Sequence, residues 1–136
     1  MKIKHKDYLE YEIPDNWIIE ENDDTVSIYC NEGKGALTIS FFSIIELYKT
    51  LDEHISIMAK KFIDCNQIKL DHAPILYKTK NDKTVLYGVG SSENGWFVKL
   101  WIIARYPKVV FATYDSEKKT SELKKVEKII SSFTFI

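Results

Sequence analysis

The sequence predicts an α+β domain in which an antiparallel β-sheet is flanked by two helices. Residues 96–105 are the densest run of β-branched and aromatic residues, and residues 109–114 return after a short turn, which predicts a central β-hairpin. Shorter alternating segments elsewhere predict its neighbouring strands. Residues 51–62 and 117–132 carry apolar side chains at helical spacing and predict the two helices.

The length and composition are those of one globular domain. The 136 residues contain no linker rich in glycine, proline or serine, so we assign residues 1–136 to a single domain. A hydrophobic content of 45% allows a core and excludes a disordered chain. Because the formal net charge is -1, the chain as a whole carries no basic excess, and we expect no nucleic-acid partner.

The sequence shows no pattern of export. Its first seven residues are basic, but no apolar segment follows them, so no secretory signal is predicted. No apolar run approaches the ~18 residues of a membrane span. Cys30 and Cys65 stand in separate segments without C-x-x-C spacing, as expected of reduced thiols. We therefore expect a cytoplasmic protein without a metal or cofactor.

The central strand is apolar on both of its faces. Trp96, Val98 and Leu100 share one face with residues 102 and 104, while Phe97 and Trp101 share the other with Lys99, Ile103 and Arg105. Such a strand belongs in the middle of a sheet. Either both faces are covered, or one face is left as a surface for a partner.

The segments before this strand supply further elements. Residues 8–13, 17–20, 25–30 and 36–42 are extended in pattern, and a glycine-rich turn makes the last two a predicted hairpin. Thr50 and Glu53 match a capping box, which predicts the start of the first helix. Residues 68–79, interrupted by Pro74, and residues 84–90 then lead into the central hairpin as an antiparallel meander of four strands.

The last helix is expected to begin after Asp115 or Ser116, either of which can serve as its N-cap. Its apolar stripe includes Leu123, Val126 and Ile130. Residues 133–136 are too apolar to remain free in water, so we expect them to pack back onto the domain.

Catalytic patterns are weak. Cys65, Asp71 and His72 are the residue types of a thiol hydrolase, but no local signature surrounds the cysteine. Gly88 and Gly90 lack the third glycine and the following helix of a dinucleotide-binding loop. We therefore expect that the protein is not an enzyme.

Two short motifs resemble those of a known family. Residues 11–17, with Tyr11, Pro14 and Trp17, resemble the aromatic-x-x-P-x-x-W opening of the Mog1/PsbP/DcrB-like domains. Residues 129–135, with Ser132 and Phe133, resemble the I-x-x-S-F-x-F ending of the same group. Together with the order of the elements, the resemblance covers nearly the whole chain and indicates a small bacterial protein of this kind.

The resemblance implies an α/β/α sandwich that serves as a non-enzymatic binding or assembly module. Members of the group include a nuclear-transport GTPase-binding protein, a photosystem subunit and bacterial proteins of the secretion-chaperone type. Because these partners differ so widely, the resemblance implies a protein partner without identifying it. The oligomeric state also stays open.

The sequence leaves two functions open. The first is a protein-binding module whose contact surface includes Phe97, Trp101, Arg105 and Tyr106, with the aromatic rings as anchors and the arginine as a charged rim. The second is a small-ligand or lipid-binding domain of the helix-grip type, with an apolar pocket beneath the last helix. If the aromatic side chains are instead core, the acidic turn at residues 20–24 is the next candidate surface.

Overall fold

The computed structural model describes residues 1–47 and 49–136, which form two helices and two antiparallel sheets. The elements in chain order are β1 (Lys2–His5), β2 (Leu9–Glu12), β3 (Trp17–Glu21), β4 (Thr25–Cys30), β5 (Gly35–Ser43), α1 (Leu51–Cys65), β6 (Lys69–Leu70), β7 (Ile75–Lys78), β8 (Thr84–Ser91), β9 (Phe97–Arg105), β10 (Lys108–Ser116), α2 (Glu122–Ser131) and β11 (Thr134–Phe135).

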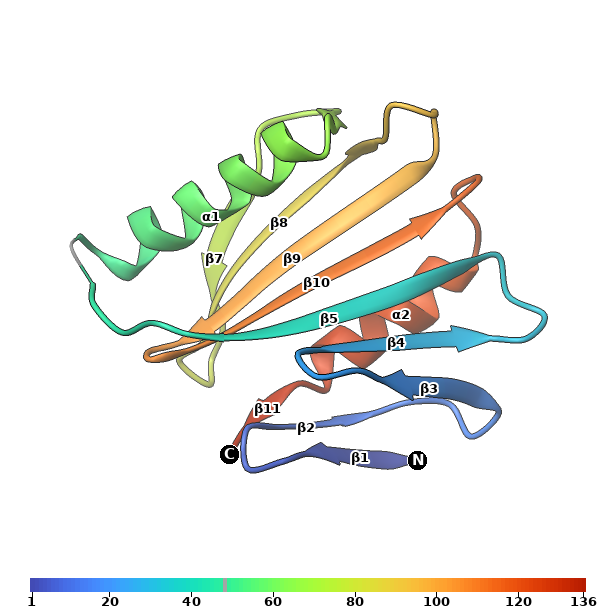
Figure 1. Ribbon diagram of the computed structural model, residues 1–136, viewed down its shortest axis with the longest axis horizontal. Coiled ribbons are helices and arrows are strands. Elements are labelled where there is room, and N and C mark those ends of the chain that lie inside the picture. Colours follow the sequence, from blue (N-terminus) through green and yellow to red (C-terminus); the bar gives the residue numbers. More distant parts are fainter. Residues whose placement is uncertain (48) are drawn as a thin grey trace.

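The larger sheet has the strand order β3-β4-β5-β10-β9-β8, and β6 and β7 both pair with β8 at its outer side. The smaller sheet has the order β1-β2-β11 and lies beside β3 (Figure 1). All of these pairings are antiparallel. The predicted α+β class and the predicted meander are therefore confirmed.

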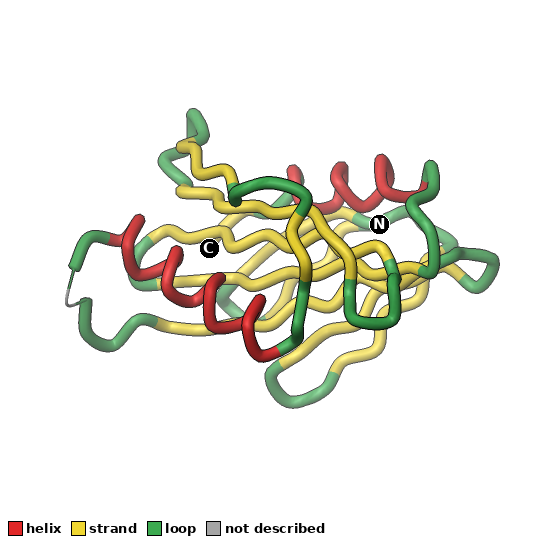
Figure 2. The backbone as a smooth tube through the Cα atoms, turned by 90° about the horizontal axis from the view of Figure 1, so that it is seen from above, coloured by secondary structure: helices red, strands yellow, loops and turns green. Residues whose placement is uncertain are grey.

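The two helices cover opposite faces of the larger sheet, which makes three layers (Figures 1 and 2). Leu100 and Ile102 of β9 belong to the core beneath α1, whereas Trp101 and Ile103 belong to the core that α2 covers. The central strand is thus buried on both faces. This corrects the expectation that the face of Trp101 is left uncovered for a partner.

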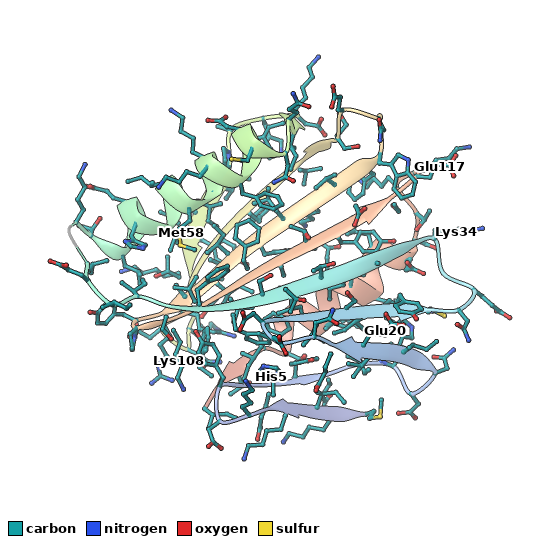
Figure 3. The ribbon with its side chains drawn as sticks, in the orientation of Figure 1. His5, Glu20, Lys34, Met58, Lys108 and Glu117 are labelled. Atoms are coloured by element: carbon teal, nitrogen blue, oxygen red, sulfur yellow. The ribbon has the colours of Figure 1, made fainter. Side chains whose placement is uncertain are left out.

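Helix α1 begins where the capping pattern predicts. The Thr50 hydroxyl accepts a hydrogen bond from the backbone N–H of Glu53 at 3.2 Å and so satisfies one free donor of the first turn. Ile55 and Ala59 are buried against the sheet, and Met58 also projects toward it (Figure 3). This apolar stripe fixes the helix on its face.

Helix α2 begins later than predicted. Its N-cap is Ser121, whereas Asp115 and Ser116 belong to β10, where Ser116 pairs with both Gly35 and Phe97. The carboxylate of Glu122 then accepts hydrogen bonds from the Tyr114 hydroxyl at 2.8 Å and from the backbone N–H of Gly35 at 3.2 Å. The start of the helix is therefore tied to the first residue of β5 and to β10.

The C-terminal residues pack back onto the domain, as predicted. Phe133 is fully buried, and β11 pairs with β2. The Lys108 ammonium donates to the carbonyl oxygen of Ile136, across from the Tyr8 ring. Strands β1 and β11, which the sequence did not predict, close the small sheet over the α2 face of the core.

Candidate functional site

Strand β7 is an open edge of the larger sheet. It pairs with β8 on one side, and no other strand among residues 1–47 and 49–136 pairs with it (Figure 1). All four of its residues are exposed, including Ile75 at 41%, Leu76 at 40% and Tyr77 at 47%. An exposed apolar edge strand is unusual in a monomer, since it is a template for pairing with another chain.

The register of β7 shows which face each side chain lies on. Ile75 and Tyr77 lie across from Tyr87 and Val85 on the α2 side of the sheet, while Leu76 lies across from Leu86 on the α1 side. Both faces of the strand are therefore apolar. Each face opens into a cleft.

The cleft on the α1 side has a volume of about 380 Å³. It lies between α1 and the β7 edge and is lined by Ser56, Ala59, Lys60, Ile63, Leu70, Pro74, Leu76 and Leu86. We call it the α1 cleft. Its lining is mostly aliphatic, and Lys60 contributes the only full charge among these residues.

The cleft on the other side, which we call the α2 cleft, has a volume of about 480 Å³. It lies between α2 and strands β7 to β9 and is lined by Ile75, Tyr77, Tyr87, Lys99, Trp101, Glu127, Ile130 and Ser131. It is more polar than the α1 cleft because it contains an ion pair. Strand β7 thus separates an aliphatic cleft from an aromatic and charged one.

Lys99 is the buried cation of the α2 cleft. Its ammonium lies 2.7 Å from the Glu127 carboxylate, and it lies 4.9 Å and 5.2 Å from the ring centroids of Tyr87 and Trp101. The lysine side chain is 11% exposed, whereas the glutamate side chain is 43% exposed. The aromatic rings and the carboxylate together stabilise a charge that has lost most of its water.

Two of the predicted contact residues lie beneath the surface. Trp101 is only 4% exposed and forms the inner wall of the α2 cleft, so the expectation of an exposed tryptophan anchor is wrong. Phe97 is half-buried and packs edge-on against the Tyr114 ring, with 6.5 Å between the centroids. Their burial follows from α2, which covers this face of the sheet.

The other two predicted residues are exposed but lie elsewhere. Arg105 and Tyr106 are at the far end of β9, about 25 Å along the strand from Phe97. They adjoin the loop after β5, where the Ile44 N–H donates to the Pro107 carbonyl at 2.8 Å. The structure therefore does not bring the four residues together into one surface.

A second group of exposed apolar residues lies where the end of β5 pairs with the start of β10. Phe42 is 45% exposed, Ile45 is 96% exposed and Tyr106 is 52% exposed, and we call these three residues the apolar tip. Lys108, labelled in Figure 3, marks the same end of the molecule. Neither the α1 cleft nor the α2 cleft includes a residue of the tip, which makes it a weaker candidate than β7.

The sequence does not single out Ile75, Leu76 and Tyr77 as candidate site residues. Pro74 correctly indicated a sheet edge, since proline cannot donate to a ladder. The missing signal was the combination of that edge with apolar residues on both faces. In a four-residue strand, this combination cannot be told from a buried strand by periodicity alone.

The remaining candidates form no catalytic arrangement within the described part of the chain. No hydrogen bond joins Cys65, Asp71 and His72, and the His72 ring instead lies 2.9 Å from the carbonyl oxygen of Ala73. No group of three or more metal-ligating side chains occurs there. None of the helices in residues 1–47 and 49–136 is long and apolar enough to cross a membrane.

The acidic turn at residues 20–24 is exposed on the far edge of the sheet from β7. The Glu20 carboxylate accepts a hydrogen bond from the Tyr29 hydroxyl at 2.6 Å, which raises the pKa of Tyr29. Glu20 projects from β3 (Figure 3). None of the clefts described above includes these acidic residues.

Comparison with known proteins gives matches in structure. No family model and no curated protein matches the sequence. The solution structure of cyanobacterial PsbP (CyanoP) from Synechocystis sp. PCC 6803 is similar with a TM-score of 0.69 and 14% identity, over 100% of this chain and 92% of that chain. A crystal structure from Bacteroides thetaiotaomicron VPI-5482 is similar with a TM-score of 0.55 and 13% identity, over 94% of this chain and 45% of that chain.

These similarities define the class of fold. The protein is an α+β domain with an antiparallel sheet between two helices, and this architecture is PsbP/Mog1-like. The fold indicated by the two sequence motifs is therefore confirmed. At such low identities, the similarity shows the fold alone.

Proposed function

We propose that this protein is a non-enzymatic protein-binding or assembly module that contacts its partner through β7 and the two clefts beside it. The observation that carries the proposal is the exposure of Ile75, Leu76 and Tyr77 on an unpaired sheet edge. Apolar area of this kind is costly in water and is retained where a partner covers it. A cytoplasmic location is part of the same proposal.

The proposed contact surface differs from the one predicted from the sequence, which comprised Phe97, Trp101, Arg105 and Tyr106. Trp101 forms part of the wall of the α2 cleft, and Phe97 packs against the Tyr114 ring within the sheet. Arg105 and Tyr106 belong to the apolar tip or its border, which serves as the comparison surface in the experiment.

Affinity capture with two matched variants tests the proposal. Tyr77→Lys places a charge on the β7 edge, and Ile45→Lys places one on the apolar tip, where the side chain is 96% exposed. We expect Tyr77→Lys to lose the partner that the unchanged protein retains, while Ile45→Lys keeps it. Loss of the partner with Ile45→Lys alone would place the contact surface at the apolar tip. Full capture by both variants would contradict a role for either surface.

A small-ligand function is the second candidate, and the α2 cleft is the observation that favours it. Its volume of about 480 Å³ suits a small ligand, and it lies between the last helix and the sheet, as the helix-grip alternative requires. Native mass spectrometry of the purified protein tests this function. A co-purified molecule that is lost on Tyr87→Ala, at the cleft wall, would support it.

A further inference from the structure

We infer that the partner segment is an extended strand that adds to β7, with apolar side chains directed to both sides and a carboxylate on the α1 side. This inference rests on the proposed function and specifies the partner of the same site. It follows from three features of the edge: its backbone groups, its two clefts and its charges.

The backbone of β7 requires a strand as its occupant. In an antiparallel ladder, successive residues point their N–H and C=O groups alternately toward the two neighbouring positions. Strand β8 pairs with β7 on one side. Apart from this ladder, no backbone hydrogen bond among the described residues involves Ile75–Lys78, so the outward groups of β7 are unpaired there. A helix cannot pair with these groups because its own backbone groups are bonded internally, whereas an extended segment can.

The clefts match the side chains of such a strand. Alternate residues of an added strand point to opposite faces of the sheet. On one face they meet the α1 cleft next to Leu76, and on the other they meet the α2 cleft next to Ile75 and Tyr77. Both clefts are partly apolar, so an occupant with apolar residues at successive positions would bury side chains on both sides. An amphipathic strand would fill only one cleft.

The charges favour an acidic occupant on the α1 side. Lys60 lines the α1 cleft, and Lys78 shares the α1 face of β7 with Leu76. Neither lysine has an ion-pair partner among the residues that the structure describes. In the α2 cleft, by contrast, Lys99 is already paired with Glu127. Of the residues named for β7 and its two clefts, only those on the α1 side therefore offer an unpaired cation to a carboxylate of the partner.

The same lysines argue against a second copy of the chain as the occupant. Lysine on an edge strand commonly prevents self-pairing, because pairing of two copies would bring their lysines close together and their charges would repel. Pro74 limits the ladder further at the start of β7. A partner strand with a complementary acidic residue removes the repulsion that a second copy would create.

Selection of peptides against the whole protein tests the inference. The probe is a library of random ten-residue peptides, and the strongest binders are synthesised and measured by fluorescence anisotropy. We expect apolar residues at successive positions with an acidic residue among them, and slower amide exchange at residues 75–78 on binding. Two peptides methylated at every second backbone nitrogen, one at the odd positions and one at the even positions, give a further test. Only one of the two should lose binding, because only one set of N–H groups faces β7.

Two charge variants of α1 supply the matched comparison. Lys60→Glu should weaken the acidic peptide at least tenfold, and a lysine in place of the peptide's acidic residue should restore binding. Lys61→Glu changes the neighbouring residue, which lines a different hollow on α1, and should leave the affinity within twofold. Equal losses in both variants would contradict the placement of the carboxylate.

Other outcomes overturn the inference in distinguishable ways. Helical bound peptides, a library without binders, or peptides that protect another segment would contradict the added strand. So would a concentration-dependent dimer with protected residues 75–78, which would identify a second copy as the occupant. If Tyr77→Lys still abolishes partner capture in these cases, the proposed function stands without the strand, whereas unchanged capture removes both.

Discussion

The ammonium of Lys99 and the carboxylate of Glu127 lie 2.7 Å apart and connect the central strand to the last helix across the α2 cleft. The lysine is nearly buried and the glutamate is not, so the two partners are not equivalent. Removal of the glutamate leaves a cation with little water around it. Removal of both leaves an apolar site beside Tyr87 and Trp101.

We therefore expect Glu127→Ala to lower the free energy of unfolding by about 1–2 kcal/mol, less than for a fully buried pair because Glu127 is partly exposed. The double variant Glu127→Ala with Lys99→Met should recover most of this loss. Urea denaturation at neutral pH measures both. Glu117→Ala, at an exposed glutamate without an ion pair in the described structure, is the control and should change stability little.

Trp101→Ala should act on stability first. The side chain is 4% exposed, and truncation of a buried tryptophan leaves a cavity that costs about 3–5 kcal/mol. Thermal and urea unfolding check this expectation. Trp96→Ala is the matched control because Trp96 is 41% exposed, and it should cost much less. Similar losses in the two variants would contradict the burial of Trp101.

Tyr11→Phe is expected to stabilise the protein by about 1 kcal/mol. The Tyr11 hydroxyl is buried and has no hydrogen-bond partner in the described structure, and an unsatisfied buried polar group is unfavourable. Phenylalanine keeps the ring that packs against Phe133, with 5.4 Å between the centroids. A lower midpoint in urea for the variant would indicate a partner for the hydroxyl.

The same residue should contribute to alkaline unfolding. Burial, with a smaller contribution from the Glu21 charge, raises the pKa of Tyr11 to about 12, and burial together with the hydrogen bond to Glu122 raises the pKa of Tyr114 to about 12. The folded state holds these protons more tightly than the unfolded state, where the pKa is about 10. The contribution of these two tyrosines to the free energy of unfolding is therefore fully present below about pH 10 and is lost as the pH rises toward 12. Tyr11→Phe should reduce this decline, which urea midpoints between pH 8 and pH 11 would measure.

Deletion of residues 117–136 should abolish cooperative folding. These residues include α2 and β11, so their loss would expose the buried side chains of the sheet face around Trp101 and leave β2 without one of its neighbours. We expect an insoluble or molten chain without a sharp thermal transition, as followed by near-ultraviolet circular dichroism. A cooperative transition near that of the full chain would contradict this role of the helix.

Titration of thiols in the denatured, unreduced protein should count both cysteines. Cys30 lies in β4 and Cys65 ends α1, and both are free in the structure. Detection of an intramolecular bridge by mass spectrometry would contradict the expected reducing compartment.

The sequence by itself determined the elements that depend on short-range patterns. The dense run of β-branched and aromatic residues at 96–105 predicted β9, and the Thr50 and Glu53 pattern predicted the start of α1, because strand propensity and helix capping act over a few residues. The two terminal motifs predicted the PsbP/Mog1-like fold. The predicted start of α2 is too early: Asp115 and Ser116 are paired with two neighbouring strands, which a local capping pattern does not show, and the N-cap is Ser121.

Only the tertiary structure decided which surfaces are covered. Trp101 and Tyr77 are both aromatic residues of β-strands, yet one is 4% exposed and the other 47%. The difference arises because α2 packs over β9, whereas among residues 1–47 and 49–136 no strand pairs with the outer side of β7. Burial depends on contacts between segments far apart in the chain. A pattern of neighbouring residues does not show which distant segment packs on a given strand.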